Sequence, residues 1–196
     1  MRKNDISIIV SAPSGCGKTT IIERLLSRDN SFEFVVSTTT RNKRKGETGG
    51  KNYYFISSKE FKDLIDRNEL IEWSIVYENY YGITKKEFDR IQSAEKIPIF
   101  DVDVQGAVTL KDKLKNAVYI FIVPPSFEVL KERLIERKTD SKKSIEVRLQ
   151  NVRNELKHVS IFDYVIVNDI IDTAVDDLSA IIRAELCRNK SMPVNY

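Results

Sequence analysis

Residues 12–19 constrain the fold of this chain more than any other segment. They read Ala-Pro-Ser-Gly-Cys-Gly-Lys-Thr, follow an apolar, β-rich run at 6–11 and lead into a helical pattern at 18–27. Glycines in such a turn let backbone N–H groups surround phosphate oxygens, and the helix that follows adds its positive dipole end. Ala12 stands where the usual phosphate loop has its first glycine. The segment therefore predicts a nucleotide-binding α/β domain.

The residue types in this loop suggest how it binds a phosphorylated nucleotide. Lys18 can reach the β- and γ-phosphates, and the Thr19 hydroxyl can bind Mg²⁺. The residues that we expect around the phosphates are Ala12, Pro13, Ser14, Gly15, Cys16, Gly17, Lys18, Thr19 and Thr20. A phosphate loop indicates nucleotide binding, but it does not distinguish a kinase from a GTPase or a motor.

Strand-like and helical patterns alternate along most of the chain. Continuous apolar runs at 97–102 and 118–123 are typical of central parallel strands, and 164–167 reads as a last strand. This alternation predicts an α/β fold with a parallel sheet core and helices on both faces. The rhythm breaks near residues 35–95, which are richer in Thr, Tyr, Gly and charge and therefore read as an inserted subdomain.

Residues 34–95 also contain local sequence signals for short strands and for helix starts. Short strands are expected at 34–37 and 53–56. Two helices are expected to begin at capping boxes, formed by Ser57 with Glu60 and by Thr84 with Glu87.

Composition argues against several classes of function. The net charge of +3 is too small to indicate nucleic acid as the main partner. Two isolated cysteines, Cys16 and Cys187, are not a disulfide framework, which favours a reducing cytoplasm. No segment approaches the length of a membrane span. We therefore expect a cytoplasmic protein with neither nucleic acid nor a membrane as partner.

A basic segment at 37–47 supplies a second candidate anion site. It reads Ser-Thr-Thr-Thr-Arg-Asn-Lys-Arg-Lys-Gly-Glu, and phosphoryl transfer to a second nucleotide requires such a site facing the phosphate loop. Arg41 and Arg44 could clamp one phosphate through paired hydrogen bonds. Taken alone, the segment is equally consistent with a solvated basic patch or a nucleic-acid patch.

Several further blocks, taken together with these two, resemble one known family. They are Ser-Ala-Pro-Ser-Gly-Cys-Gly-Lys-Thr at 11–19, the basic segment at 37–47, Gly-Lys-Asn-Tyr-Tyr-Phe at 50–55, Ile-Glu-Trp at 71–73, Asn-Tyr-Tyr-Gly at 79–82, Asp-Val-Asp-Val-Gln-Gly at 101–106, Pro-Pro-Ser at 124–126 and Val-Ile-Val-Asn-Asp at 165–169. Their types and order over nearly the whole chain resemble the guanylate kinase family. The resemblance implies transfer of a phosphoryl group from ATP to GMP, assisted by Mg²⁺, with ADP and GDP as products.

The resemblance also implies a division of the chain. It suggests a single kinase domain, residues 1–196, with the P-loop kinase fold. The core would comprise 1–34, 97–125 and 155–196, the GMP-binding insertion 35–96, and a helical lid 126–154.

The resemblance further implies residue roles, each carried to a matching position. The GMP phosphate would be bound by Arg41, Arg44, Tyr53 and Tyr81, and the guanine by Ser37, Glu72 and Asp103. Asp101 and Thr19 would hold Mg²⁺, directly or through water. The catalytic cations would be Lys18, Arg41, Arg133, Arg137 and Arg148, and Asn168 would lie at the adenine of ATP.

Chemistry supports some of these roles independently of the resemblance. Guanine presents two adjacent donors, N1–H and the 2-amino group, and the carboxylate of Glu72 can accept both, whereas it would repel the N1 acceptor of adenine. Asp101 and Asp103 alternate along a strand, so their side chains should point to opposite faces. Arg133 and Arg137 are four residues apart and would share one helix face.

One departure and several alternatives stay open at this point. Ile83 stands where the family usually has a hydroxyl that contacts guanine. A monophosphate kinase for another base remains an alternative, as does use of dGMP or IMP. So does a guanylate-kinase-like interaction module without catalysis. A GTPase could use Asp-Val-Gln-Gly at 103–106 as a switch, but no Asn-Lys-x-Asp motif is present. Both a monomer and a homodimer are compatible with the sequence.

Overall fold

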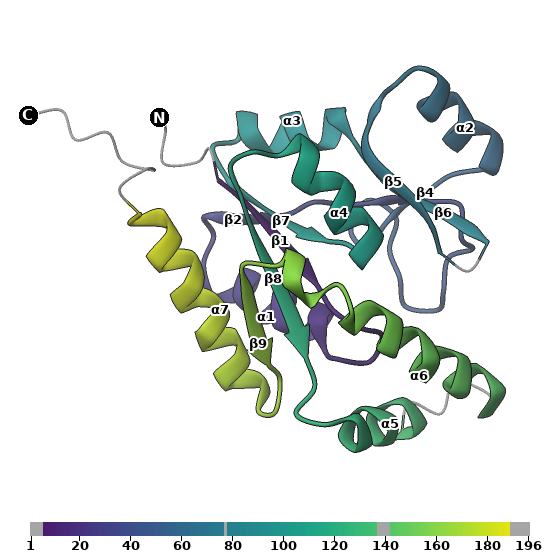
Figure 1. Cartoon of the computed structure of the whole chain (residues 1–196). Helices are drawn as coiled ribbons and strands as arrows, with labels where there is room; N and C mark the ends of the chain where they lie inside the picture. Colours follow the sequence, from purple (N-terminus) through teal and green to yellow (C-terminus); the bar gives the residue numbers. More distant parts are fainter. Residues whose placement is uncertain (1–5, 77, 137–141, 189–196) are drawn as a thin grey trace, which may run out of the picture.

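A five-stranded parallel sheet forms the centre of the molecule (Figure 1). The computed structural model describes residues 6–76, 78–136 and 142–188 of the 196-residue chain. The strands lie in the order β2-β7-β1-β8-β9. Their bounds are β1 Ser7–Ser11, β2 Phe32–Phe34, β7 Ile97–Asp101, β8 Ala117–Val123 and β9 Tyr164–Val167. The predicted strands at 6–11, 97–102, 118–123 and 164–167 are thereby confirmed to within two residues.

Helices cover both faces of this sheet, as the alternation predicted. On β1, Ile8 and Val10 pack into a cluster with residues of α1 (Lys18–Arg28) and α7 (Ile171–Leu186). Ile9, between them, packs on the other face with residues of α3 (Lys85–Ser93) and α4 (Val104–Lys113). Successive strand side chains point to opposite faces, so a strand buried on both sides reads as a continuous apolar run.

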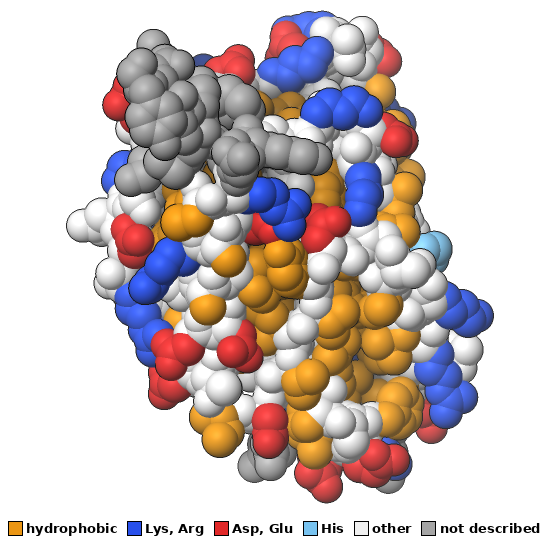
Figure 2. All heavy atoms as spheres, turned by 60° about the vertical axis from the view of Figure 1, so that its left-hand side comes forward, with side chains coloured by type: hydrophobic (Ala, Val, Ile, Leu, Met, Phe, Trp, Pro, Cys, Tyr) orange, Lys and Arg blue, Asp and Glu red, His pale blue; other side chains and the backbone are white. Residues whose placement is uncertain are grey.

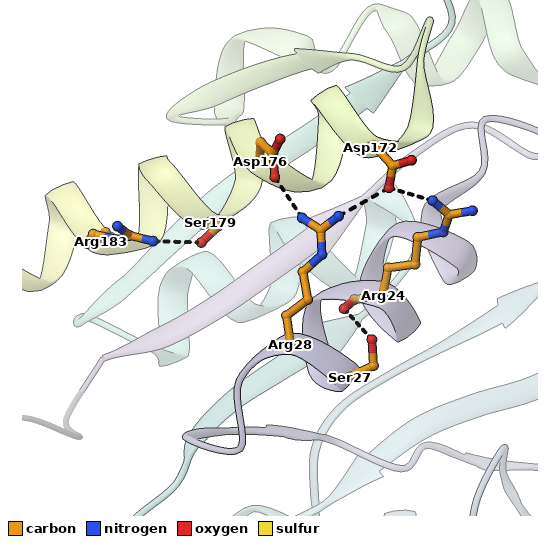
Figure 3. A network of polar contacts seen from close by, with 7 residues as sticks. All are labelled: Arg24, Ser27, Arg28, Asp172, Asp176, Ser179 and Arg183. Carbon is orange, nitrogen blue, oxygen red and sulfur yellow. Dashed lines mark hydrogen bonds and ion pairs between the residues drawn. The ribbon is translucent and has the colours of Figure 1, made fainter.

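Helices α1 and α7 lie side by side, joined at the surface by ion pairs (Figure 3). Arg24 Nη1 lies 2.5 Å from Asp172 Oδ1, and Arg28 lies 3.1 Å from Asp172 and 2.6 Å from Asp176. These groups are exposed, so the pairs contribute little next to the apolar packing beneath them. The contact matters for the site because α1 follows the phosphate loop and α7 follows residues 168–169.

The insertion builds a second, mixed sheet in the order β4-β3-β6-β5. Its elements are β3 Thr38–Thr39, β4 Tyr54–Phe55, α2 Ser58–Asp66, β5 Leu70–Val76 and β6 Asn79–Thr84. The strand expected at 53–56 is present, but the one expected at 34–37 is wrong. Strand β2 ends at Phe34 and β3 begins at Thr38, because the chain leaves one sheet for the other between them.

One capping box is complete and the other is half formed. Ser57 and Glu60 cap α2 reciprocally. Thr84 caps α3 by accepting from the Glu87 backbone N–H, as expected. The Glu87 carboxylate does not return to Thr84 and instead accepts from the Val36 backbone N–H at 3.1 Å. Glu87 therefore ties α3 to the segment between the two sheets.

Two helices, α5 (Phe127–Glu136) and α6 (Lys142–Leu156), follow β8 and pack against each other. A short 3₁₀ turn, η1 (Val159–Ile161), then leads to β9 (Figure 1).

Figure 2 shows the side of the molecule on which α7 lies, where hydrophobic side chains gather between charged groups. Strand β9 is a sheet edge, and its Val165 and Val167 are exposed. No helix in the described ranges combines the length and apolarity needed to cross a membrane.

Candidate active site

A cavity of about 360 Å³ lies where the phosphate loop, the second sheet and α6 meet. The phosphate loop contributes residues 12–20, all of which were predicted to bind nucleotide. The other predicted residues in its wall are Ser37, Arg44, Tyr53, Glu72, Tyr81, Asp101, Asp103 and Arg148. Arg41, Arg133 and Asn168 do not line it, and Arg137 falls outside the described residues. Most of the residues predicted to bind the two nucleotides, ATP and GMP, therefore line one cavity.

The phosphate loop depends on two glycines with left-handed backbone conformations. Gly15 has φ +96° and Gly17 has φ +84°, values that L-residues with a side chain rarely adopt. A Cβ at Gly17 would also lie 2.4 Å from Nδ2 of Asn168, which donates a 2.7 Å hydrogen bond to the Cys16 carbonyl. Asn168 is only 1% exposed, so in this structure its side chain supports the loop from behind. Its contact with adenine stays a prediction.

Lys18 is the first residue of α1, and its side chain reaches the carboxyl end of β7. Its Nζ is 2.6 Å from Asp101 Oδ1 and donates a 2.8 Å hydrogen bond to the Val102 carbonyl. Asp101 and Thr19 offer a carboxylate and a hydroxyl to the same cavity, and oxygen donors of this kind suit Mg²⁺. The described residues contain no cluster of three or more metal-binding side chains, so phosphate oxygens and water would have to complete the coordination.

Arg41 and Arg44 were both predicted to bind the GMP phosphate, but the structure places them differently. Arg44 lines the cavity, whereas Arg41 forms a two-pronged pair with Glu47, at 2.7 and 3.1 Å. The Arg41 guanidinium also lies 5.2 Å from the centre of the Tyr53 ring. The hydrogen bond from Arg41 holds the pKa of Glu47 below its usual range. Arg41 therefore already has an anionic partner beside the cavity.

Two tyrosines, Tyr53 and Tyr81, form part of the cavity wall. The rings of Tyr53 and Tyr81 meet edge to face, with centres 5.9 Å apart. Burial raises the pKa of Tyr53 to about 12. Its hydroxyl therefore stays protonated at neutral pH and can donate to an anionic ligand.

Glu72 is a buried carboxylate in the wall of the cavity. It is 4% exposed, and among the described residues it interacts with the charges of Asp103 and Lys113 rather than with a hydrogen-bond donor. Burial, with a smaller effect of the Asp103 charge, raises the pKa of Glu72 to about 8, and Lys113 opposes the rise. A bulge between Leu70 and Glu72 shifts the pairing of β5 with β6. Bulges often re-aim a side chain beside a functional site.

The prediction that Asp101 and Asp103 point to opposite faces of one strand is wrong. Strand β7 ends at Asp101, and Asp103 is the N-cap of α4. Its Oδ1 accepts from the Gly106 backbone N–H at 2.7 Å, and its Oδ2 accepts from the Ser74 hydroxyl at 3.1 Å. A short acidic side chain satisfies the free N–H groups of a helix start, which ends the strand early. Both carboxylates consequently line the same cavity.

Arg133 on α5 and Arg148 on α6, both predicted as lid cations, contact residues in or beside the phosphate loop. Arg148 Nη1 donates to Ser14 Oγ at 2.9 Å. Arg133 donates to the carbonyl oxygens of Asn168 and Asp169, at 2.9 and 3.3 Å. Arg148 thus reaches the loop itself, whereas Arg133 holds the segment that follows β9.

Sequence reasoning missed four residues of the wall: Ser74, Val76, Val102 and Glu155. Glu155 is the most informative, because burial raises its pKa to about 7, with Lys18 opposing and Asp103 adding to the rise. A signal was available, since Glu155 lies seven residues after Arg148 and so on the same face of α6.

These features define a class of protein before any relative is considered. A phosphate loop at the carboxyl ends of a parallel sheet, with an inserted sheet across a shared cavity, is the arrangement of a P-loop kinase. The family model described as guanylate kinase matches residues 4–185, and the chain belongs to that family.

Individual relatives agree with this assignment. A guanylate kinase of Clostridium tetani is 44% identical over 181 residues, covering 92% of this chain and 86% of the relative. One from Caldanaerobacter subterraneus is 41% identical, covering 96% and 91%. The crystal structure of a guanylate kinase from Anaplasma phagocytophilum has a TM-score of 0.77 and 33% identity, covering 94% of this chain and 87% of that one.

Proposed function

We propose that this protein transfers the γ-phosphoryl group of ATP to GMP and releases ADP and GDP. Membership of the guanylate kinase family supports the reaction. The observation that carries the choice of acceptor base is Glu72, a buried carboxylate that lines the cavity without a donor from the described protein. Such a group favours a ligand that brings its own donors, because an unpartnered buried acceptor is costly.

Guanine meets that requirement with N1–H and the 2-amino group. Burial leaves Glu72, with a pKa of about 8, largely protonated at neutral pH in the empty site. Hydrogen bonds from these two donors favour its charged form, and the ionised carboxylate can accept both. Ser37 and Asp103 lie in the same wall for further base contacts. Adenine would place an acceptor against the carboxylate, so it would be rejected. dGMP keeps the same base, and IMP keeps N1–H but lacks the amino group, so we expect dGMP to be used and IMP to be used less well.

The phosphate of GMP would lie between the second sheet and the phosphate loop. Arg44, Tyr53 and Tyr81 face this space directly. Arg41 would join them by exchanging its Glu47 partner for phosphate, since both anions accept paired hydrogen bonds from a guanidinium.

The donor side would use residues 12–20, with Lys18 at the β- and γ-phosphates. Thr19 and Asp101 would hold Mg²⁺, which supplies charge neutralisation on the phosphate oxygens when bound. Arg148 from α6 already reaches the loop, and Arg133 and Arg137 are the further lid cations that we propose for the transferring group. Asn168 would support the loop and the adenine side of the site.

The assignment of GMP and ATP to different segments also implies how the chain is divided. Residues 1–34, 97–125 and 155–196 would form the core of one kinase domain, 35–96 the GMP-binding insertion and 126–154 the lid. Closing of the insertion and lid over both substrates would exclude water, which otherwise competes as acceptor. We further propose a cytoplasmic enzyme that works as a monomer or a homodimer.

A direct assay tests the proposal. Purified protein is incubated with ATP, Mg²⁺ and one of GMP, dGMP, IMP, AMP or UMP, and ADP and the new diphosphate are measured. We expect the highest kcat/KM with GMP and no reaction without Mg²⁺. Preference for AMP or UMP would assign the site to another base. Tight GMP binding without ADP formation would instead support an interaction module.

A further inference from the structure

Gly106 lies against the base-reading carboxylate. It is the third residue of α4, and a Cβ built on it would lie 2.9 Å from Oε2 of Glu72. The same Cβ would lie 3.2 Å from Val102 Cβ and 3.3 Å from Asp103 Oδ1. The first distance is shorter than any ordinary contact, whereas the other two are only tight.

The backbone does not require glycine at this position. Gly106 lies inside a regular helix and is absent from the residues with positive φ, so alanine could adopt its conformation. Glycine is also among the poorest helix formers and alanine the best. Conformation alone would therefore favour alanine, and the reason for glycine lies in the side chain that it faces.

We propose that Gly106 is a positioning residue for base selection: the missing Cβ leaves the space that the Glu72 carboxylate occupies when it reads guanine. This inference rests on the proposed phosphorylation of GMP. With alanine, Oε2 would have to retreat by about half an ångström to reach an ordinary van der Waals separation. Glu72 is the residue that would move, because its carboxylate is the free end of a flexible side chain.

A displacement of this size is enough to matter. Two parallel hydrogen bonds to N1–H and the 2-amino group require both carboxylate oxygens in place, and hydrogen bonds weaken with small changes in length and angle. The present position also brings the carboxylate to the first turn of α4, where the helix dipole favours negative charge. Alanine would weaken both effects while leaving the phosphate loop untouched.

The test is Gly106→Ala, with Val108→Ala as control. Val108 is exposed on the same helix, so its replacement also raises helix propensity but touches neither Glu72 nor the cavity. For Gly106→Ala we expect the KM for GMP to rise about ten- to a hundredfold, the range for weakened hydrogen bonds to a charged group. We expect less than a threefold change in kcat and in the KM for ATP, and a smaller preference for GMP over IMP. Val108→Ala should match the wild type.

A double-mutant cycle separates positioning from packing. If Gly106 acts through Glu72, then Gly106→Ala introduced into a Glu72→Gln protein should change the KM for GMP less than twofold. Equal effects in both backgrounds, an unchanged KM in the single variant, or a Gly106→Ala protein that fails to fold would each overturn the inference. A wild-type protein that does not phosphorylate GMP would overturn the proposed function instead.

Discussion

Replacing the buried carboxylate with its neutral isostere, Glu72→Gln, should stabilise the ligand-free protein at high pH. Burial raises the pKa of Glu72 from its ordinary 4.5 to about 8, so the folded state binds this proton more tightly than the unfolded state does. The stability contributed by the protonated form is therefore fully present below about pH 4.5 and is lost as the pH rises through 8.

The size of the effect follows from the same pKa. Each tenfold difference in proton affinity corresponds to about 1.4 kcal/mol, so ionising Glu72 in the folded protein costs up to about 5 kcal/mol. Glu72 is 4% exposed, so solvent screening reduces this figure little, although relaxation around the charge reduces it. We expect Glu72→Gln to be more stable than the wild type by about 2–4 kcal/mol at pH 9, with little difference at pH 4.5.

Urea unfolding of the ligand-free proteins between pH 4.5 and 9 measures this directly. A matched control is Glu132→Gln on α5, where an exposed carboxylate is replaced and no such divergence is expected. GMP turnover by Glu72→Gln should fall, because an amide cannot accept both guanine donors. A stability difference between Glu72→Gln and the wild type that is the same at pH 4.5 and pH 9 would refute the reasoning.

Three further substitutions test other parts of the site. Lys18→Ala should lower kcat about a hundredfold or more in a folded protein, because charge stabilisation carries phosphoryl transfer; near-normal turnover would contradict the assignment. Arg41→Met should cost about 2–5 kcal/mol of transition-state stabilisation with GMP and leave ATP binding nearly intact, as steady-state kinetics would show. Ile83→Ser should destabilise by about 3 kcal/mol in thermal or urea unfolding without improving GMP use, because Ile83 is 0% exposed within the apolar cluster of α3 and α4 and does not line the cavity.

The parts of the fold that sequence could predict are those governed by local pattern. The glycines and lysine at 12–19 determine where strand, loop and helix meet, and the apolar runs at 97–102 and 118–123 indicate central strands. The crossing from β2 to β3 leaves no comparable signal. Residues 35–37 are as buried as a strand, and Val35 and Val36 are apolar, but the three residues connect two sheets, and the partners that decide this are distant in sequence.

The candidate site shows the same limit at the level of single side chains. Spacing placed Asp101 and Asp103 on one strand, but capping of α4 competed successfully for Asp103. Residue type predicted phosphate binding for both Arg41 and Arg44, but only the folded loop shows that Arg41 is paired with Glu47. Contacts of this kind depend on geometry, which neither periodicity nor composition encodes.

Before any ligand binds, the groups proposed to bind phosphate and the group proposed to read the base differ in their hydrogen-bond partners. Two of the cations expected to bind phosphate already have anionic partners: Lys18 pairs with Asp101, and Arg41 pairs with Glu47. Phosphate must replace or share these partners, so the gain from binding it is a difference between two charged hydrogen-bonded states, and many phosphorylated ligands could achieve it. Glu72 has no hydrogen-bond donor among the described residues, so under the proposed function a base that cannot donate would leave its buried carboxylate without one. In the proposed function, rejection of the wrong base would therefore fall on Glu72, because sites built to hydrogen-bond a ligand discriminate most strongly against ligands that leave them unpaired.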